Sequence, residues 1–289
     1  MVDSFSIKYL SCFGKQGRGD GEFYAPRGVT IDALGNVYVA DLGNMRIQKF
    51  DSQGRFLMKF RVDGWPNAMA IDRNGIMYVA DVQKHCVHKL DTLGHLLMKF
   101  GKQRRFGSWR GSEDGEFDKP RSVHFDAVGN LYVVDSSNHR VQKLDAAGRF
   151  LSKFGRKGKN GGGLFSEPHD LAFDGQGCVY VTDTLHHMVQ KFDQTGNFLL
   201  KFGGEGKRDG EFQEPGGIAT DKNENIFVVD IRNDRIQVFN SEGNFLLKFG
   251  GSGKGAGQLR LPHSIAISEL GEIYITDRGN NRVQKFSIC

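Results

Sequence analysis

Short apolar runs alternate with polar turns in the same order along the chain. In the first unit, β-branched and aromatic residues are concentrated at residues 28–32, 37–40, 46–50 and 56–60, and Gly, Asn or Asp occupy the segments between them. Such runs, bounded by turn residues, predict four antiparallel strands. No stretch places apolar residues at the three- and four-residue spacing of a helix. The pattern therefore predicts an all-β protein.

The four-strand unit occurs six times. Each copy carries an aspartate after its second strand, and these aspartates are Asp41, Asp81, Asp135, Asp183, Asp230 and Asp277. Each first strand begins at a proline, and the six prolines of the chain are Pro26, Pro66, Pro120, Pro168, Pro215 and Pro262. The spacing matches one propeller blade, a small sheet that needs a neighbour on both faces. The fold class is therefore a six-bladed β-propeller of four-stranded antiparallel blades.

The ends of the chain account for the last blade. The sixth unit stops after three strands, at residues 286–289, and residues 9–14 resemble the fourth strand at residues 96–101. We expect the N-terminal strand to complete the last blade and close the ring, which would remove two open sheet edges. Residues 1–289 then form a single domain.

Composition adds few constraints. The 38% of hydrophobic residues and 23 Phe suffice for six cores between blades, and no apolar run is long enough to cross a bilayer. The N-terminus lacks the pattern of a secretory signal. Cys12, Cys86, Cys178 and Cys289 show no close spacing, so we expect buried thiols and a reducing, cytoplasmic compartment. We expect a monomeric propeller without a cofactor.

The formal net charge of +5 has a partly structural origin. Lysines recur on the third strands (Lys49, Lys89, Lys143, Lys191 and Lys285) and on the fourth strands (Lys59, Lys99, Lys153, Lys201 and Lys248). Lysine keeps an outer strand soluble. We therefore interpret these ten residues as a solvated rim and not as a binding surface.

One face of the propeller should carry the variable loops. The residue after each proline should line the mouth of the central channel, and these residues are Arg27, Asn67, Arg121, His169, Gly216 and His263. They differ between blades, whereas a structural position would tend to repeat, so this ring is the best candidate site. A water-filled channel lined by polar residues is the alternative, and the sequence does not decide between the two.

The loop after each second strand carries a second pattern. Asp-x-x-Asn-x-Arg is complete in four units, for example at Asp41, Asn44 and Arg46, and the second and fourth units depart from it. Asp and Asn suit tight turns, and Arg can reach a carboxylate on the same or next blade. Because the pattern repeats, a structural role is favoured.

Two linkers between blades are basic. Residues 101–119 include Arg104 and Arg105 beside Phe106 and Trp109, and residues 155–167 carry three cations against one carboxylate. Basic residues with aromatic platforms suit single-stranded nucleic acid. Four acidic residues in the first linker weaken this signal.

These motifs resemble a known family. Tyr-Val-x-Asp-x-x-Asn-x-Arg-(Ile/Val)-Gln, with Phe-Gly and Gly-x-Phe-x-x-Pro in the linkers, resembles the NHL repeat along the whole chain. The resemblance implies a six-bladed propeller. In the TRIM-NHL branch it implies a module that binds RNA or protein through the variable face. Matched by position, the contact residues would be Arg27, Arg121, Arg104, Arg105, His139 and Arg278.

A more distant resemblance is to the peptidyl-hydroxyglycine amidating lyase propeller, in which histidines after alternate prolines hold zinc. His169 and His263 match two of these positions, but Asn67 occupies the third and no partner is found for the catalytic tyrosine or arginine. A calcium-dependent lactonase would need channel carboxylates, which the post-proline ring lacks.

The sequence thus favours a binding module over an enzyme. Its partner is single-stranded RNA or a protein, with RNA favoured by the cationic ring and linkers. The candidate ligand-binding residues are Arg27, Asn67, Arg121, His169, His263, Arg104, Arg105, His139 and Arg278. The runner-up is a metal-dependent lyase or hydrolase with His169 and His263 as candidate ligands.

Overall fold

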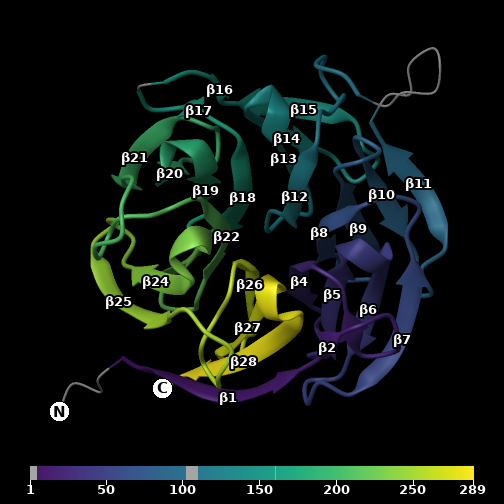
Figure 1. The fold of residues 1–289 in the computed structure, drawn as a ribbon. Helices are drawn as coiled ribbons and strands as arrows, with labels where there is room; N and C mark the ends of the chain where they lie inside the picture. The colour runs from purple at the N-terminus through teal and green to yellow at the C-terminus, as the bar shows by residue number, and fades with distance from the viewer. Residues whose placement is uncertain (1–4, 102–109, 160) are drawn as a thin grey trace.

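Six four-stranded sheets form a closed ring around a central axis in the computed structural model (Figure 1). The structure describes residues 5–101, 110–159 and 161–289. Within each of these six sheets, neighbouring strands are antiparallel. The prediction of a six-bladed propeller with four-stranded blades is confirmed.

The blades follow one another in chain order, each with its first strand nearest the axis. Blades one to three are β4 (Pro26–Ile31), β5 (Val37–Asp41), β6 (Arg46–Phe50) and β7 (Phe56–Arg61); β8 (Pro66–Ile71), β9 (Met77–Asp81), β10 (Cys86–Leu90) and β11 (Leu96–Phe100); and β12 (Pro120–Phe125), β13 (Leu131–Asp135), β14 (Arg140–Leu144) and β15 (Phe150–Phe154). Blades four to six are β18 (Pro168–Phe173), β19 (Val179–Asp183), β20 (Met188–Phe192) and β21 (Phe198–Gly203); β22 (Pro215–Thr220), β23 (Ile226–Asp230), β24 (Arg235–Phe239) and β25 (Phe245–Gly250); and β26 (Pro262–Ile267), β27 (Glu272–Asp277), β28 (Arg282–Ile288) and β1 (Ile7–Phe13).

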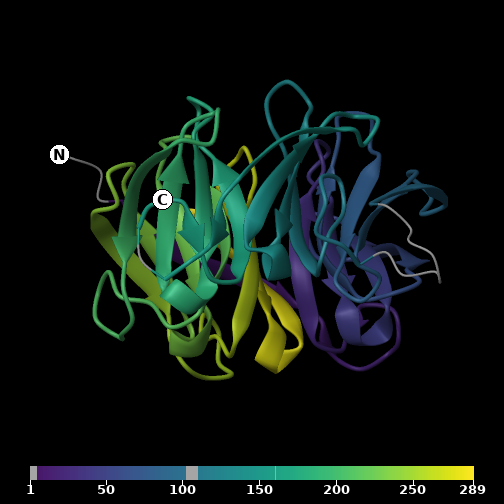
Figure 2. The same cartoon turned by 90° about the horizontal axis from the view of Figure 1, so that it is seen from above.

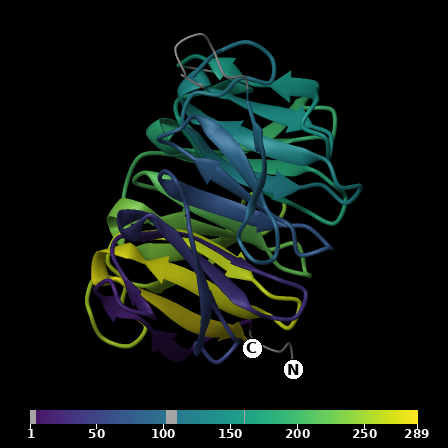
Figure 3. The ribbon, with the colours of Figure 1, turned by 90° about the vertical axis from the view of Figure 1, so that its right-hand side faces the viewer.

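Short 3₁₀ turns mark one face of the ring. They join the second and third strands and are η1 (Leu42–Asn44), η3 (Ser136–Asn138), η4 (Thr184–His186), η5 (Ile231–Asn233) and η6 (Arg278–Asn280). Figures 2 and 3 show these coils on the same side of the ring, which we call the loop face. The tight turns after the first and third strands lie on the opposite side, the turn face. Two linkers add small parallel pairs, β2 (Lys15–Gln16) with β3 (Glu22–Phe23) and β16 (Arg156–Lys157) with β17 (Leu164–Phe165).

The N-terminal strand closes the ring, as the sequence predicts. β1 pairs antiparallel with β28, from Ile7 opposite Ile288 to Phe13 opposite Val283. Beyond the strand ends, Ser6 and Cys289 exchange two backbone hydrogen bonds of 3.2 and 2.9 Å. The two ends of the described chain therefore lie side by side (Figure 1).

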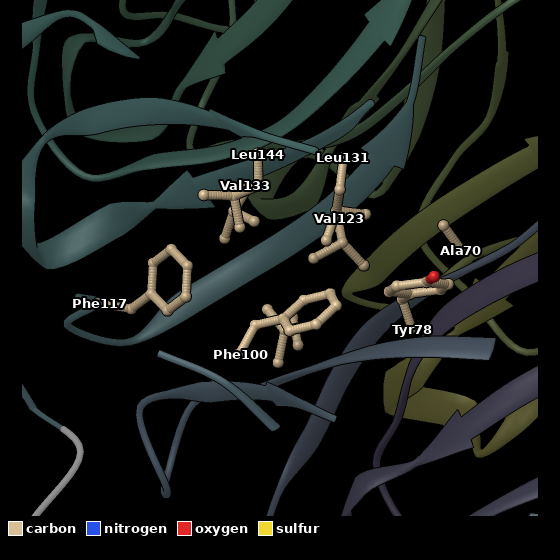
Figure 4. Close-up of a cluster of buried hydrophobic side chains, with 10 residues drawn as sticks. Ala70, Tyr78, Phe100, Phe117, Val123, Leu131, Val133 and Leu144 are labelled. Atoms are coloured by element: carbon tan, nitrogen blue, oxygen red, sulfur yellow. The ribbon is translucent and has the colours of Figure 1, made fainter. Parts of the chain in front are cut away.

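A separate apolar cluster fills each interface between neighbouring blades. In the cluster of Figure 4, Tyr78 and Phe100 of blade two pack against Phe117, Val123 and Val133 of the third repeat. Five further clusters serve the other interfaces. Apolar side chains are thus buried between neighbouring blades and not within a single blade, as expected for repeats that stack.

The packing of neighbouring blades also requires a glycine in the turn after the third strand. Gly54 has φ +80°, and a Cβ there would lie 2.6 Å from the Phe13 ring of the preceding outer strand. Both the left-handed backbone and the approach of the ring require glycine. Gly94, Gly148, Gly196 and Gly243 meet the rings of Phe60, Phe100, Phe154 and Phe202 in the same way.

The third-strand lysines are not a solvated rim, and that interpretation was wrong. Lys49 Nζ lies 5.0 Å from the centroid of the Tyr38 ring and 3.4 Å from the Asp32 carboxylate. The third strand is not the outermost, so its lysine stacks on the tyrosine of the second strand. Blade five has Phe227 and Val238 at these two positions, so tyrosine and lysine are replaced together. Of the fourth-strand lysines, Lys59, Lys153 and Lys248 are about half exposed and contact linker aspartates.

The cysteines differ from expectation. Cys86 is buried, whereas Cys178 is partly exposed and Cys12 and Cys289 are exposed. Burial raises the pKa of the Cys86 thiol to about 12. Among the described residues, no helix has the length and apolar character needed to cross a membrane.

Candidate binding site at the channel mouth

A β-bulge positions the residue after each proline. In blade one Pro26 pairs with Asp41, but the next partners are Val29 and Val39, so Arg27 lies outside the regular ladder. The other five first strands shift register at the same point. A bulge re-aims a side chain and ends regular pairing. The six bulges therefore present a ring of side chains at the loop-face end of the channel.

The structure brings most of the predicted ring together around one small cavity. This cavity has a volume of about 170 Å³, and its lining includes Arg27, Arg121, His169, His263, Arg278 and Arg232. Arg27 and Arg121 come from the first strands of blades one and three, whereas Arg278 comes from η6 of blade six. Gly216, the ring member of blade five, has no side chain and is not part of the cavity lining.

Both polar atoms of the Asn67 side chain form hydrogen bonds with neighbouring blades. Its Oδ1 accepts a hydrogen bond of 2.6 Å from Arg27 Nη1, and its Nδ2 donates one of 2.6 Å to the carbonyl oxygen of Arg121. Asn67 is 1% exposed. It therefore links blades one, two and three beneath the mouth and orients the Arg27 guanidinium.

The mouth carries more positive than negative charge. Arg121 contacts Glu167 at 2.6 Å and Arg232 contacts Glu214 at 2.9 Å, whereas Arg27 and Arg278 form no ion pair within the described residues. Burial, together with the charges of Arg278 and Arg121, lowers the pKa of Arg27 to about 10. Like charges held this close are costly unless an anion accompanies them. An anionic group is the ligand chemistry that this arrangement favours.

Two buried histidines lie side by side in the same mouth. The ring centroids of His169 and His263 are 4.7 Å apart, and the side chains are 6% and 5% exposed. Burial and then the Arg121 charge lower the pKa of His169 to about 3. Burial, His169 and Arg27 hold the pKa of His263 well below its ordinary value. Both rings are therefore neutral at pH 7.

These histidines do not form a zinc site with what surrounds them. A catalytic zinc needs about three protein ligands, and the third position is Asn67, whose amide is already bonded on both sides. Four guanidinium groups line the cavity and would repel a cation. Within residues 5–101, 110–159 and 161–289, no group of three or more His, Cys, Asp or Glu is arranged to hold a metal ion. The residues present do not fit the metal.

The Asp-x-x-Asn-x-Arg motif binds the linker that precedes its own blade. Arg46 Nε contacts Asp41 Oδ2 at 2.7 Å, while Nη2 donates to the carbonyl oxygens of Gly19 and Glu22. Asn44 bonds Gly17 in the same linker. The Asp41 carboxylate is fully buried and also accepts from the backbone N–H of Tyr24. We call this set the linker clamp, and its role is structural.

The two departures from the motif have physical reasons. Blade two follows a short linker, residues 62–65, and Asp81 is bonded instead by His88 Nε2 at 2.9 Å. In blade four Met188 replaces the arginine, and His186 Nδ1 reaches Asp183 Oδ2 at 2.7 Å. A histidine therefore supplies the donor wherever the arginine is missing.

His139 has a structural contact and does not line the cavity. It follows η3 in the left-handed conformation, with φ 55°, and its Nδ1 accepts a hydrogen bond of 3.1 Å from the backbone N–H of Glu167 in the next repeat. His85, His187, Asp234 and Asn281 make the equivalent contact with Lys119, Glu214, Leu261 and Ala25. We call this contact the blade latch. Blade one has Met45 at this position.

We expect His139→Ala to lower the free energy of unfolding by about 1 kcal/mol, because the partly buried backbone amide of Glu167 loses its acceptor. His139→Asn should cost less, since Asn281 makes the same contact in blade six.

Burial and Lys157 lower the pKa of His139. A folded pKa below the unfolded value of about 6.5 means that the latch contributes fully above that pH and is lost as pH falls. Urea titrations from pH 7.5 to 5 should show a smaller pH dependence for His139→Asn than for the native protein. An equal dependence would contradict the latch.

The other predicted residues fall into two groups. Arg104 and Arg105 lie outside the described residues. Arg278 lines the mouth as the resemblance implied, together with Arg232 and Glu214, which the sequence did not indicate. Glu167, also not indicated, contacts Arg121. The residue before each proline also varies between repeats, so the argument used for the ring could have found Glu167 and Glu214.

Larger hollows lie on the turn face. Two of them, of about 360 and 620 Å³, share residues 267–270 and open between blades five, six and one. Two of their carboxylates stabilise the turns: Asp32 accepts from the backbone N–H groups of Leu34 and Asn36, and Asp221 accepts from those of Asn223 and Asn225. They lack the convergent charged groups of the mouth.

Comparison with known proteins identifies the repeat. Residues 23–50, 117–144 and 259–286 match the NHL repeat, and residues 164–236 match a model described as a 6-bladed beta-propeller. B-box type zinc finger protein ncl-1 of Caenorhabditis elegans is 35% identical over 151 residues, which cover 50% of this chain and 17% of that protein. Protein brain tumor of Drosophila melanogaster is 29% identical over 154 residues, which cover 51% of this chain and 14% of that protein. The alignments thus span less than a fifth of either relative.

A solved streptogramin B lyase has a similar fold. It superposes with a TM-score of 0.69 at 14% identity and covers 99% of this chain and 98% of its own. At this level of identity the likeness concerns the fold alone.

Proposed function

Because this chain is a six-bladed NHL-repeat propeller with relatives among the TRIM-NHL proteins, we propose that it is a binding module for single-stranded RNA. Its contact surface is the loop face around the channel mouth. The observation that carries the proposal is the cluster of Arg27, Arg121 and Arg278, of which Arg27 and Arg278 have no carboxylate partner in the described chain. Phosphate contacts supply much of the affinity of such surfaces.

The linkers extend this surface. Arg156 and Lys157 in β16 are exposed, and their strand belongs to the linker that leads to His169. Arg232 and Arg278, in the 3₁₀ turns of blades five and six, lie at the cavity itself. A single strand could follow these cations across the loop face while one of its phosphates enters the mouth.

The test is RNA binding at two salt concentrations. We expect Arg121→Gln/Arg278→Gln to weaken binding to a randomised single-stranded RNA pool about tenfold. Each neutralised phosphate contributes about 0.7 to the slope of log affinity against log salt, and both arginines contact the one phosphate in the mouth, so the slope should fall by about 0.7. Fluorescence anisotropy at 50 and 150 mM salt measures both quantities.

The control pair is Arg73→Gln/Lys222→Gln. Both side chains are exposed on the turn face, so this variant loses the same charge from the opposite side of the ring. Equal weakening by the two pairs would indicate nonspecific attraction. An absence of saturable binding by the native chain would refute the RNA proposal and favour a protein ligand on the same face.

A metal-dependent lyase or hydrolase receives no support from the mouth. The committed amide of Asn67 and the surrounding guanidinium groups oppose cation binding at His169 and His263. We therefore propose no catalytic function.

A further inference from the structure

Four buried nitrogen atoms at the channel mouth have no hydrogen-bond partner among the described residues. They are Nε of Arg27, Nε of Arg278, Nδ1 of His169 and Nδ1 of His263. All four residues line the same cavity. Buried polar atoms in proteins are nearly always satisfied, so orphaned groups that converge on one space indicate a missing ligand atom.

We propose that the channel mouth binds one tetrahedral oxyanion through Arg27, Arg121 and Arg278, and that the pair of His169 and His263 takes up a proton when the anion enters. The inference rests on the proposed function in using the same surface, and it names the group that this surface recognises. The phosphate of an RNA strand and a free phosphate-type anion share this chemistry.

The size and charge of the cavity suit a single anionic group. About 170 Å³ accommodates a phosphate-sized group, and the walls supply four guanidinium groups, of which that of Arg232 is paired with Glu214. Guanidinium matches the geometry of phosphate oxygens, often through two parallel hydrogen bonds. Asn67 holds the Arg27 fork from below, so the fork is oriented before a ligand arrives. A preoriented donor loses less conformational freedom on binding.

The surroundings of the histidines make proton uptake depend on the anion. The charged and titratable groups that face the pair are Arg27 on β4, Arg121 and His124 on β12, Asp170 on β18 and Arg278 on η6, while Asn67 on β8 and Gly216 on β22 do not titrate. Arg232 and Glu214 also line the cavity and contact each other, and Glu167 contacts Arg121. The Asp170 carboxylate is already bonded to His124 Nε2 at 2.7 Å and to the backbone N–H of Ile218 at 3.2 Å.

Burial, and with it the repulsion from the neighbouring cations, keeps both imidazoles neutral in the empty mouth. An anion placed among them cancels part of this repulsion and offers an acceptor for an N–H of the ring. Opposite charge within about 4–6 Å favours the protonated form. Binding should consequently strengthen as the pH falls.

Sulfate is the probe, because it does not titrate near neutral pH and any proton taken up belongs to the protein. We expect saturable sulfate binding whose affinity rises about tenfold per pH unit between pH 7 and 5, as linkage to one proton requires. Calorimetry in two buffers of different ionisation enthalpy counts the protons directly. No saturable binding in this range, or binding without proton uptake, would overturn the proposal.

Variants separate the two parts of the site. Arg278→Gln should weaken sulfate binding at least tenfold at pH 5.5, whereas Arg73→Gln on the turn face should not. His169→Asn/His263→Asn should retain sulfate binding and lose its pH dependence. If the double variant unfolds, proton counting on the native protein still decides the question. A pH dependence that survives in a folded double variant would exclude the histidines. Acetate bound more tightly than sulfate would overturn the preference for a tetrahedral anion.

Competition distinguishes the source of the oxyanion. If sulfate displaces single-stranded RNA at constant ionic strength, an RNA phosphate occupies the mouth and the inference is supported together with the proposed function. If sulfate binds with proton uptake while RNA does not bind, the RNA proposal fails and the oxyanion site stands for a free anion.

Discussion

A chain that lacks residues 1–13 is expected to lose its cooperative unfolding transition. β1 supplies the outermost strand of blade six, and Phe5, Ile7 and Tyr9 pack against the cluster that joins blades five and six. Phe13 packs in the next cluster, between blades six and one. Four half-buried apolar side chains at about 1 kcal/mol or more each, with a full strand of hydrogen bonds, approach the whole stability of a typical domain. Circular dichroism during urea unfolding measures the loss.

A circular permutant is the matched control. Ser6 and Cys289 are hydrogen-bonded to each other, so a two- to four-residue turn could join Cys289 to Phe5, with new ends at Gly14 and Lys15. This protein keeps every residue of β1 but carries it after β28. It should unfold cooperatively, close to the native midpoint. A deletion variant as stable as the permutant would show that β1 is dispensable.

Arg235→Met is expected to destabilise the protein by about 3–5 kcal/mol, the usual cost of removing one partner from a buried ion pair. Arg235 Nε contacts Asp230 Oδ2 at 2.8 Å, and its Nη2 bonds two linker carbonyl oxygens. Burial already raises the pKa of Asp230. Without the guanidinium this pKa should rise further. Urea unfolding at pH 7.5 measures the loss of stability.

Blade four suggests the rescue. There Met188 occupies the arginine position, and His186, in the asparagine position, bonds Asp183. The double variant Asn233→His/Arg235→Met copies that arrangement into blade five and should recover part of the loss. The exposed Lys222→Ala, within about 0.5 kcal/mol of the native protein, sets the baseline. If the double variant is no more stable than Arg235→Met alone, histidine does not replace the arginine in the linker clamp.

The sequence was sufficient for the architecture because each structural device repeats. Strand order and blade number follow from the short apolar runs and the six prolines, ring closure follows from the likeness of residues 9–14 to a fourth strand, and the structure confirms them. The lysines of the third strands were misjudged because a strand pattern does not say which neighbour covers a side chain. Lys49 stacks on Tyr38 across one pair of strands, a contact that only the register reveals.

Only part of the candidate site could be predicted from the sequence. The bulge after each proline turns Arg27 and His263 toward the channel mouth. The sequence indicated this site because the residue after the proline varies between repeats. The 4.7 Å approach of His169 to His263, and the two hydrogen bonds that commit Asn67, depend on the curvature of the ring. No spacing in the sequence encodes that curvature. His139 looked like a surface contact because a latch between blades has no sequence signature of its own.

The linker clamps also bear on how the chain folds during synthesis. Each clamp joins residues fewer than 30 positions apart, as from Gly17 to Asn44, so each repeat can form soon after it leaves the ribosome. β1 is the opposite case, because it is made before all other strands of the ring and its partner β28 is made after them. Until β28 has been synthesised, β1 has no strand to pair with, and the incomplete ring of blades has an open edge. The strand that gives the finished ring its closure is therefore the segment most in need of a chaperone while the ring is being made.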